Sequence, residues 1–290
     1  MHAGEFAVEV PLVRRLISSQ FPEWASLPLE RVASGGTDNA LFRLGAELCV
    51  RLPRIVSAVG QVEKELEWLP RLAPALPLEI PQPLVQGVPE EGYPWAWGVY
   101  RWLEGEEVDP DAVVDAASDV ASFLAALQRF DTTGGPPGRS RGIPLNRRDA
   151  SFRAALADLG DEVDRRALFT VWERALQAPE WEQEPRWLHG DLWPANMLMR
   201  ERRLSAILDF AALSVGDPAT DLMVAWTLLV SETRPLLRAQ LGVDDATWMR
   251  GRGWAVSWAV IALPYYLETN PVIVRAARRT LDQVLLDEVE

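Results

Sequence analysis

Two carboxylates and an amide in one stretch of the sequence have the types and spacing that phosphoryl transfer requires. Asp191 is followed five residues later by Asn196, and Asp209 ends the next strand-like segment. Predicted strands over 197–200 and 204–208 form a hairpin that brings Asn196 and Asp209 side by side. Carboxylate and amide oxygens are ligands that Mg²⁺ prefers, and a second carboxylate can orient an attacking hydroxyl. The spacing therefore predicts a site for phosphoryl-transfer chemistry.

The scarcity of several residue types excludes other chemistries. Of the 29 Lys and Arg in the 290-residue chain, only Lys64 is a lysine, and it follows Glu63, so no Walker A loop is present. The only histidines are His2 and His189, which excludes zinc sites built on two or three histidines. Cys49 is the only cysteine, so no internal disulfide can form.

The charge balance bears on the partners. With 42 acidic residues, the formal net charge is -13, which disfavours binding to nucleic acid or to an anionic membrane and leaves cationic small molecules as partners. The first ten residues contain no basic segment typical of a signal peptide. The longest apolar run, 254–263, is about half a membrane span. We expect a cytoplasmic protein with no nucleic-acid or membrane partner.

The hydrophobic pattern predicts an α+β protein whose front part contains the strands and whose back part is mainly helical. In the front part we expect helices over 7–20 and 57–73 and strands over 29–34, 40–45, 47–52, 84–88 and 96–102. In the back part, we expect one strand-containing segment, roughly 186–210. The rest of that part is predicted to be helical, with helices over 111–129, 150–159, 161–178, 218–231, 233–241, 244–267 and 271–288. The division predicts two lobes, residues 1–103 and residues 104–290.

Three motifs follow one another in the back part: His-Gly-Asp-x-x-x-x-Asn at 189–196, Ile-Leu-Asp-Phe at 207–210 and Gly-Asp-Pro-x-x-Asp-Leu at 216–222. This ordered set resembles the aminoglycoside phosphotransferase family, whose members are relatives of the protein kinases. The resemblance extends from the loop at 35–39 to the C-terminal helices. It implies a protein-kinase-like bilobal fold, with a β-sheet-containing nucleotide-binding N-lobe (1–103) and a mainly helical catalytic and acceptor-binding C-lobe (104–290).

The resemblance also implies roles for individual residues of the back part. Asp191 becomes the catalytic base or the residue that orients the acceptor hydroxyl, and Asn196 and Asp209 become Mg²⁺ ligands. His189 would brace the loop without taking part in the chemistry. Asp217 and Asp221 are typical of a helix start, with Asp217 at the N-cap and Asp221 in the first turn; bracing of the catalytic loop is the alternative.

A kinase-like fold also needs a cation on the third strand, paired with a Glu on the following helix. Arg51 occupies the place where Lys is usual, and only Glu65 of the three helix glutamates falls on the apolar side, so we predict an Arg51–Glu65 pair. A phosphate-covering loop and an adenine-binding linker are the other expected nucleotide contacts. For the loop, a plain hairpin turn without a binding role is the alternative interpretation. These candidates are Gly35, Gly36, Thr37, Asp38 and Asn39 for the loop and Arg101, Trp102 and Leu103 for the linker.

The acceptor side offers weaker signals. Trp193 lies inside the catalytic loop, where it either contacts the acceptor or anchors the loop. Tyr266 and Glu268 are candidates for the border of the acceptor pocket.

The function implied is a Mg²⁺-dependent transfer of the γ-phosphate of ATP or GTP to a hydroxyl of a small molecule. Because most of the acidic excess lies in residues 104–290, a polycationic aminoglycoside is the expected acceptor, which makes the protein an antibiotic-resistance enzyme. A macrolide kinase and a metabolic kinase of the fructosamine, choline or homoserine type are alternatives. A non-catalytic nucleotide-binding protein is a further alternative, supported by Arg51 and opposed by the intact Asp191, Asn196 and Asp209.

Overall fold

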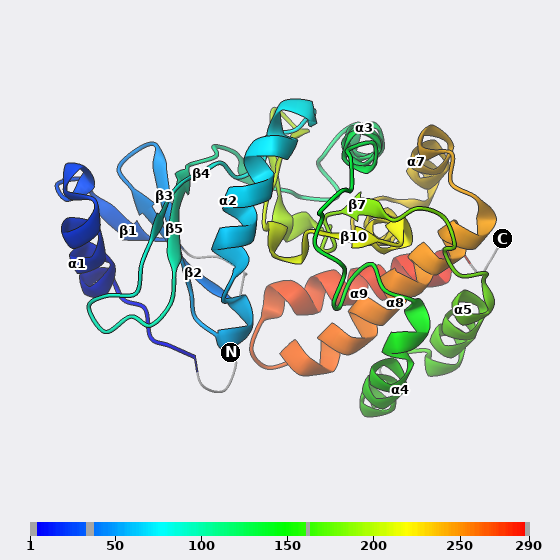
Figure 1. Cartoon of the computed structure of the whole chain (residues 1–290). Coiled ribbons are helices and arrows are strands. Elements are labelled where there is room, and N and C mark those ends of the chain that lie inside the picture. The colour runs from blue at the N-terminus through cyan, green and yellow to red at the C-terminus, as the bar shows by residue number, and fades with distance from the viewer. Residues whose placement is uncertain (1–4, 33–37, 161–162, 288–290) are drawn as a thin grey trace. The chain divides into compact units, whose positions relative to one another are not determined.

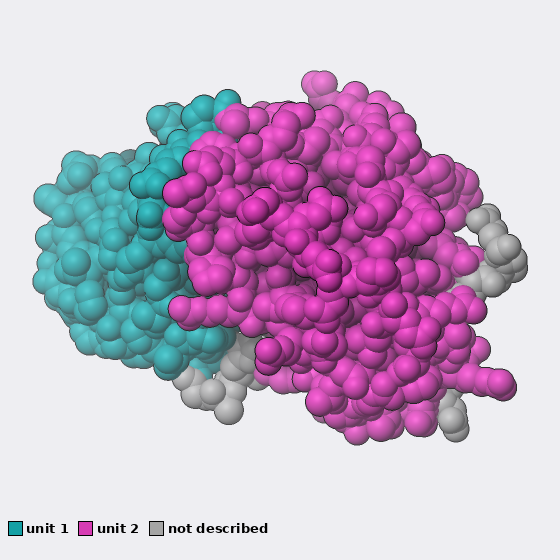
Figure 2. All heavy atoms as spheres, turned by 45° about the vertical axis from the view of Figure 1, so that its right-hand side comes forward, with its two compact units in different colours: residues 1–74, 79–104 teal, residues 75–78, 105–290 magenta. Residues whose placement is uncertain are grey.

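The protein divides into two compact units (Figures 1 and 2). The computed structural model describes residues 5–32, 38–160 and 163–287. Unit 1 comprises residues 1–74 and 79–104, and unit 2 comprises residues 75–78 and 105–290. An antiparallel sheet dominates unit 1 and helices dominate unit 2. The predicted α+β class, with a sheet-containing N-terminal part and a helical C-terminal part, is therefore confirmed.

Unit 1 contains a five-stranded antiparallel sheet with strand order β1-β2-β3-β5-β4, and two helices. The strands are β1 Leu29–Arg31, β2 Asn39–Leu44, β3 Leu48–Pro53, β4 Pro83–Gly87 and β5 Trp97–Arg101. The helices are α1 Val10–Gln20 and α2 Gln61–Leu72, with short 3-10 turns η1 Pro22–Trp24, η2 Val56–Ala58 and η3 Ala73–Ala75.

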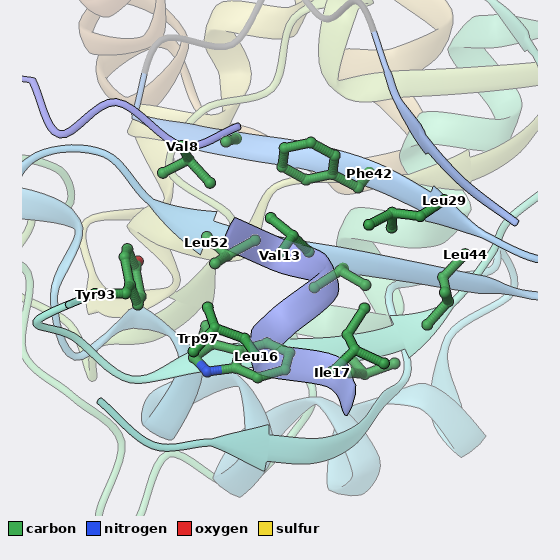
Figure 3. Close-up of a cluster of buried hydrophobic side chains, with 13 residues drawn as sticks. Val8, Val13, Leu16, Ile17, Leu29, Phe42, Leu44, Leu52, Tyr93 and Trp97 are labelled. Carbon is green, nitrogen blue, oxygen red and sulfur yellow. The ribbon is translucent and has the colours of Figure 1, made fainter. Parts of the chain in front are cut away.

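The core of unit 1 forms where α1 packs on the sheet (Figure 3). α1 buries Val13, Leu16 and Ile17, which recur at helical spacing. On β2, buried residues alternate with half-buried ones, so Phe42 and Leu44 point to the same side. This packing fixes β2 and β3, the strands that carry the polar residues described below.

α2 carries an acid on its buried side. Glu65 is fully buried on this helix, next to Lys64, the single lysine of the chain. Glu67 and Arg71 lie on the exposed side, with 3.9 Å between charged atoms and more than half of each side chain exposed, as their spacing predicts. The buried apolar residues of the helix are Val62, Trp68, Leu69 and Leu72.

Unit 2 is built from seven α-helices and two small sheets within its described residues. The helices are α3 Ala116–Gln128, α4 Asp149–Asp158, α5 Arg165–Gln177, α6 Val224–Thr227, α7 Arg234–Leu241, α8 Asp245–Tyr266 and α9 Pro271–Leu286. The strands are β6 Glu106–Glu107, β7 Arg186–Leu188, β8 Met197–Arg200, β9 Arg203–Ile207 and β10 Ser214–Gly216. Among the helices that the structure describes, none combines the length and apolarity that crossing a bilayer would need.

The predicted hairpin is present as β8 and β9, which pair antiparallel with Met197 opposite Ile207. Glu201 and Arg202 form its turn, with φ angles of 50° and 64°. Beyond the last pair, the N–H of Leu208 donates to the carbonyl of Asn196 at 2.8 Å. The hairpin therefore brings Asn196 next to the chain that leads into Asp209.

The single helix expected over 218–231 is wrong. This segment is a 3-10 helix, η8 Pro218–Met223, followed by one α-turn, α6. Every residue from Pro218 to Leu229 is buried, so tertiary packing on all sides, and not an amphipathic period, sets its conformation. The short strands β6 and β10 were not predicted, because two or three residues are too few to show a period of two.

Candidate active site

Asp191 lies on a tight loop between β7 and the 3-10 turn η6 Pro194–Asn196. Gly190 precedes it with a φ of 87°, which favours glycine, and a Cβ there would lie 2.8 Å from the carbonyl oxygen of Ala212. Gly190 therefore lets the chain turn sharply and present the Asp191 side chain, which is 29% exposed.

The Asp191 carboxylate is held on both oxygens. Asn196 Nδ2 donates to Oδ2 at 3.0 Å and to the Asp191 carbonyl at 2.9 Å. Arg141 Nη2 approaches Oδ1 at 3.4 Å, while its Nε donates to the carbonyl of Gly190 at 2.7 Å. These contacts fix the carboxylate orientation while leaving it accessible to a substrate hydroxyl.

His189 connects the loop to the strand that leads to Asp209. Its Nε2 lies 2.8 Å from the carbonyl of Leu208, and its Nδ1 accepts from the N–H of Asp191 at 3.2 Å. The tautomer protonated at Nε2 satisfies both contacts. The ring is fully buried and packs edge-on against Phe210, with centroids 4.6 Å apart. His189 therefore links the Asp191 loop to the segment that leads into Asp209.

Two further aspartates surround the loop. Asp221 is fully buried and accepts from the N–H groups of His189 and Gly190, each at 2.7 Å. Burial raises the pKa of the Asp221 carboxyl, opposed in part by the two backbone N–H groups that donate to it. Asp217 caps η8 by accepting from Ala219 N at 3.0 Å, and it pairs with the buried Arg250 at 2.8 Å.

Asn196 and Asp209 present oxygen atoms at the base of the hairpin. Because Asn196 donates with Nδ2 to Asp191, its amide oxygen has no hydrogen bond among the described residues. Asp209 has a φ of 56°, a conformation that aspartate tolerates better than most residues, and its Oδ1 accepts from Ala211 N at 3.3 Å. Within the described ranges, no group of three or more His, Cys, Asp or Glu is placed to hold a metal ion.

In unit 1, the predicted pair between Arg51 and Glu65 is confirmed. Arg51 Nη1 lies 2.6 Å from Glu65 Oε1, and both residues are buried. Gln61 accepts from Arg51 Nη2 at 2.9 Å. The Asn39 amide, oriented with its oxygen toward the guanidinium, accepts from Arg51 at 3.0 and 3.2 Å.

Tyr100 completes this buried network. Its hydroxyl donates to the second carboxylate oxygen of Glu65 at 2.6 Å. Burial, followed by the charge of Glu65, raises the pKa of Tyr100 well above its usual value, so the hydroxyl stays protonated and keeps donating. Both oxygens of Glu65 are thus occupied, which offsets the cost of burying a carboxylate.

A comparison with models of protein families assigns the chain to a family. The model of the phosphotransferase enzyme family, APH, matches residues 30–254, which is more than half of the chain. The chain belongs to the phosphotransferase enzyme family. The matched segment contains Arg51 and Glu65 of unit 1 as well as Asp191, Asn196 and Asp209 of unit 2.

Solved structures of phosphotransferases share the fold. The GDP and kanamycin complex of APH(2″)-IIia is 20% identical, with a TM-score of 0.75, covering 95% of this chain and 98% of that chain. The apoenzyme of macrolide 2′-phosphotransferase MphH from Brachybacterium faecium is 24% identical, with a TM-score of 0.61, covering 94% and 97%. Macrolide 2′-phosphotransferase type I is 20% identical, with a TM-score of 0.65, covering 95% and 98%. No curated protein sequence matches the chain.

The nucleotide-binding residues predicted for this phosphotransferase are placed unevenly. Gly35, Gly36 and Thr37 lie outside the described residues, while Asp38 and Asn39 lead into β2. In the linker, the N–H groups of Arg101 and Trp102 already donate to the carbonyls of Gln82 and Glu47, at 2.9 and 2.7 Å. The N–H of Leu103, the third predicted linker residue, donates to no backbone carbonyl of the described residues.

The predicted acceptor-binding residues are not placed together. Trp193 is 7% exposed, and its ring lies 5.4 Å from that of Trp258 on α8, so it anchors the catalytic loop to this helix. Tyr266 ends α8, eight residues beyond Trp258, which is about 12 Å along the helix axis. Glu268 follows the helix and is exposed.

Sequence reasoning missed Arg141, which, besides Asn196, contacts the Asp191 carboxylate in this phosphotransferase. Arg141 lies between α3 and α4, in a segment with no helix or strand pattern and several glycines, where no element was predicted. Its place in a long irregular segment could have indicated Arg141 as a candidate site residue, because functional side chains often lie on loops.

Unit 2 of the phosphotransferase also contains a cavity of about 230 Å³. It is lined by Gly142, Leu145, Trp181, Asp217 and Arg250, among others, and its lining includes none of Asp191, Asn196 and Asp209. The Asp217–Arg250 pair in its wall is internally satisfied. This cavity is therefore distinct from the predicted catalytic residues.

Proposed function

We propose that the protein is a Mg²⁺-dependent phosphotransferase that moves the γ-phosphate of ATP or GTP to a hydroxyl of a small molecule. The observation that carries the proposal is the Asp191–Asn196 contact, on a loop whose backbone is held by Asp221 and whose following hairpin leads into Asp209. Membership of the phosphotransferase family supports the reaction class.

Asp191 orients the acceptor in this proposal. The acceptor hydroxyl donates to the exposed edge of the Asp191 carboxylate, so its oxygen is directed at the γ-phosphorus. As the new P–O bond forms, the bond to the β-phosphate oxygen breaks, the nucleoside diphosphate leaves, and the hydroxyl proton passes to Asp191. Asn196 and Arg141 keep the carboxylate in one orientation throughout.

Asn196 and Asp209 are the proposed Mg²⁺ ligands. These oxygens fit a hard cation, because the Asn196 amide oxygen has no hydrogen bond to the described residues and Asp209 supplies a carboxylate. Two protein oxygens are enough for Mg²⁺, which usually completes its shell with water and substrate phosphates. When bound, the ion would neutralise charge on the phosphate oxygens.

Arg51 is the proposed cation for the α- and β-phosphates. The contacts to Glu65 and Gln61 fix its guanidinium, whose planar fork suits phosphate oxygens. Asp38 and Asn39 belong to the proposed phosphate-covering loop, together with the three residues before them.

The acceptor predicted from composition is an aminoglycoside-type polycation. The net charge of -13 supports it, as does the fold shared with APH(2″)-IIia, solved with kanamycin. A macrolide is the second candidate, supported by the apolar Trp193–Trp258 contact next to Asp191 and by the fold shared with MphH. Both classes belong in an acceptor panel together with hydroxylated metabolites.

The decisive test replaces the orienting carboxylate. Asp191→Ala should reduce turnover at least a thousandfold on any accepted substrate, because the hydroxyl loses its alignment, while nucleotide affinity stays within about twofold. Turnover is measured with radiolabelled ATP and GTP over the acceptor panel, and affinity by calorimetry. Asp158→Asn, an exposed change on α4, is the matched control. Unchanged turnover in Asp191→Ala would remove this residue from the mechanism.

A further inference from the structure

Two arginines of unit 2 lie around one tryptophan beside Asp191. Arg141 and Arg148 come from the segment between α3 and α4, and Arg148 ends the 3-10 turn η4 Leu145–Arg148. Their guanidinium carbons lie 5.9 and 4.9 Å from the ring centroid of Trp254 on α8. Arg141 also reaches Asp191, so the cluster adjoins the carboxylate proposed to orient the acceptor.

Arg148 is half-buried and has no carboxylate partner among the described residues. Its Nε donates to Ser257 Oγ at 2.8 Å, and Asp149, next in sequence, bonds instead to Arg153. Arg250, by contrast, pairs with Asp217. Burial, followed by the charge of Arg141, lowers the pKa of Arg148 to about 9, which still leaves it charged at neutral pH.

Trp254 adds a buried donor, its Nε1, that has no acceptor among the described residues. Buried donors and charges are normally satisfied in native proteins, so such a group needs an explanation. Among the residues that the structure describes, Asp191 is the only carboxylate that pairs with these two guanidinium groups, so the cluster has one positive charge in excess.

We propose that Arg141 and Arg148 form a subsite for an oxyanion group, a carboxylate or a phosphate ester, carried by the acceptor near its reacting hydroxyl. The inference rests on the proposed function and narrows its acceptor class. It departs from the polycationic acceptor predicted from composition, because net charge acts over the whole surface while recognition depends on the groups in contact. Arginine forks suit carboxylate and phosphate geometry, and both side chains are partly exposed.

Inorganic phosphate is the probe for the subsite, since it needs no knowledge of the acceptor. Its binding to the full chain is measured by calorimetry at constant ionic strength. Arg148→Met should weaken phosphate binding at least tenfold, as expected for loss of a charge-assisted hydrogen bond. Arg148→Lys should restore part of the affinity. Arg147→Met, an exposed neighbouring change, is the matched control and should bind like the unchanged protein. Equal affinity in Arg148→Met and the unchanged protein would overturn the proposal.

A second measurement determines whether the subsite binds an oxyanion of the acceptor or the γ-phosphate of the nucleotide, since arginine side chains could bind either. If the subsite serves the acceptor, Arg148→Met leaves the affinity for a non-hydrolysable ATP analogue unchanged. A weakened analogue would assign Arg148 to the γ-phosphate and overturn the acceptor assignment. Circular dichroism and thermal melting establish that each variant is folded, and Arg148→Lys carries the test if the Met variant is not.

The phosphate measurement does not depend on turnover, so its failure can be told apart from failure of the proposed function. Asp191→Asn should lose phosphoryl transfer and still bind phosphate through Arg148. If no acceptor is phosphorylated by the unchanged protein but phosphate binding depends on Arg148, the subsite stands and the proposed reaction fails. If transfer occurs but phosphate binding is independent of Arg148, the reaction stands and the subsite fails.

Discussion

At the residue scale, the surroundings of Arg51 explain why an arginine can occupy a position where lysine is usual. Its guanidinium reaches Glu65, Gln61 and Asn39 at once, which a single ammonium group could not do with the same geometry. Glu65 was predictable, because an acid on an apolar helix face requires a partner. Gln61 and Tyr100 were not, because neutral polar residues at these positions indicate no particular contact.

Arg51→Lys should keep the contact with Glu65 but lose the bond to Gln61. We expect nucleotide affinity to fall by up to about tenfold, which corresponds to the free energy of one or two hydrogen bonds. Arg51→Met should fall further and also destabilise unit 1 by about 3–5 kcal/mol, because Glu65 is left buried without its cation. Calorimetric titration with an ATP analogue compares the two. Equal loss in both variants would contradict a role for the positive charge.

Tyr100→Phe removes the donor to Glu65 Oε2. The loss should destabilise the protein by about 1–3 kcal/mol, because one oxygen of a buried carboxylate becomes unsatisfied. It should also weaken nucleotide binding severalfold, since Glu65 no longer fixes Arg51 firmly. Tyr93→Phe is the matched control, because Tyr93 donates to the carbonyl of Pro53 and is equally buried. If the two variants lose stability and nucleotide affinity alike, Tyr100 has no special link to the nucleotide.

At the element scale, the loop that carries Asp191 is supported by short elements, of which the sequence indicated only some. The β8–β9 hairpin was predictable from alternation and turn residues. β10 was not, although its pairing with β7 supports the loop that follows β7. The contacts from Asp221 could not be located either, since the sequence indicated a helix start but not which backbone N–H groups the carboxylate would accept.

On α4, Asp149 pairs with Arg153 at 2.8 Å and accepts from the indole N–H of Trp172 on α5 at 2.8 Å, and the strength of the ion pair should depend on pH. Arg153 lowers the pKa of Asp149, assisted by the indole N–H of Trp172 and opposed by burial. A depressed carboxyl pKa gives stability that is present above the ordinary Asp value and lost as pH falls through the lowered one. Because both side chains are a third or more exposed, the contribution is about 0.5–1 kcal/mol.

Asp149→Asn should therefore reduce stability by about 0.5–1 kcal/mol at neutral pH, and the difference should shrink as pH falls below the ordinary range of an Asp carboxyl. The amide oxygen can still accept from Trp172, so the change isolates the charge. Urea unfolding at several pH values provides the measurement, with Asp158→Asn as control. A difference that persists unchanged in acid would show that the loss does not come from the charge of Asp149.

At the scale of the whole molecule, the two units contain different groups of the candidate site. Unit 1 holds the buried Arg51 network, and unit 2 holds Asp191 with its supporting loop. The sequence indicated this division through its change from strand to helix patterns. The family motifs lie mainly in unit 2, so the contacts of unit 1 had to be inferred from burial and charge.

Separate cores predict stepwise unfolding. Scanning calorimetry should show a transition broader than a two-state process, with a calorimetric enthalpy larger than the van't Hoff value. Tyr100→Phe should lower the component of unit 1, whereas Asp149→Asn should lower that of unit 2. A single two-state transition that both variants shift alike would mean that the units unfold together.

The solitary lysine on α2 makes the chain unusually simple to label. An amine-acylating dye has one side chain to modify, Lys64, and a thiol reagent finds only the buried Cys49, whose pKa burial raises to about 12. A fluorophore on Lys64 would sit one residue from Glu65. Its emission would report, without mutagenesis, on the helix that holds Arg51 through Glu65.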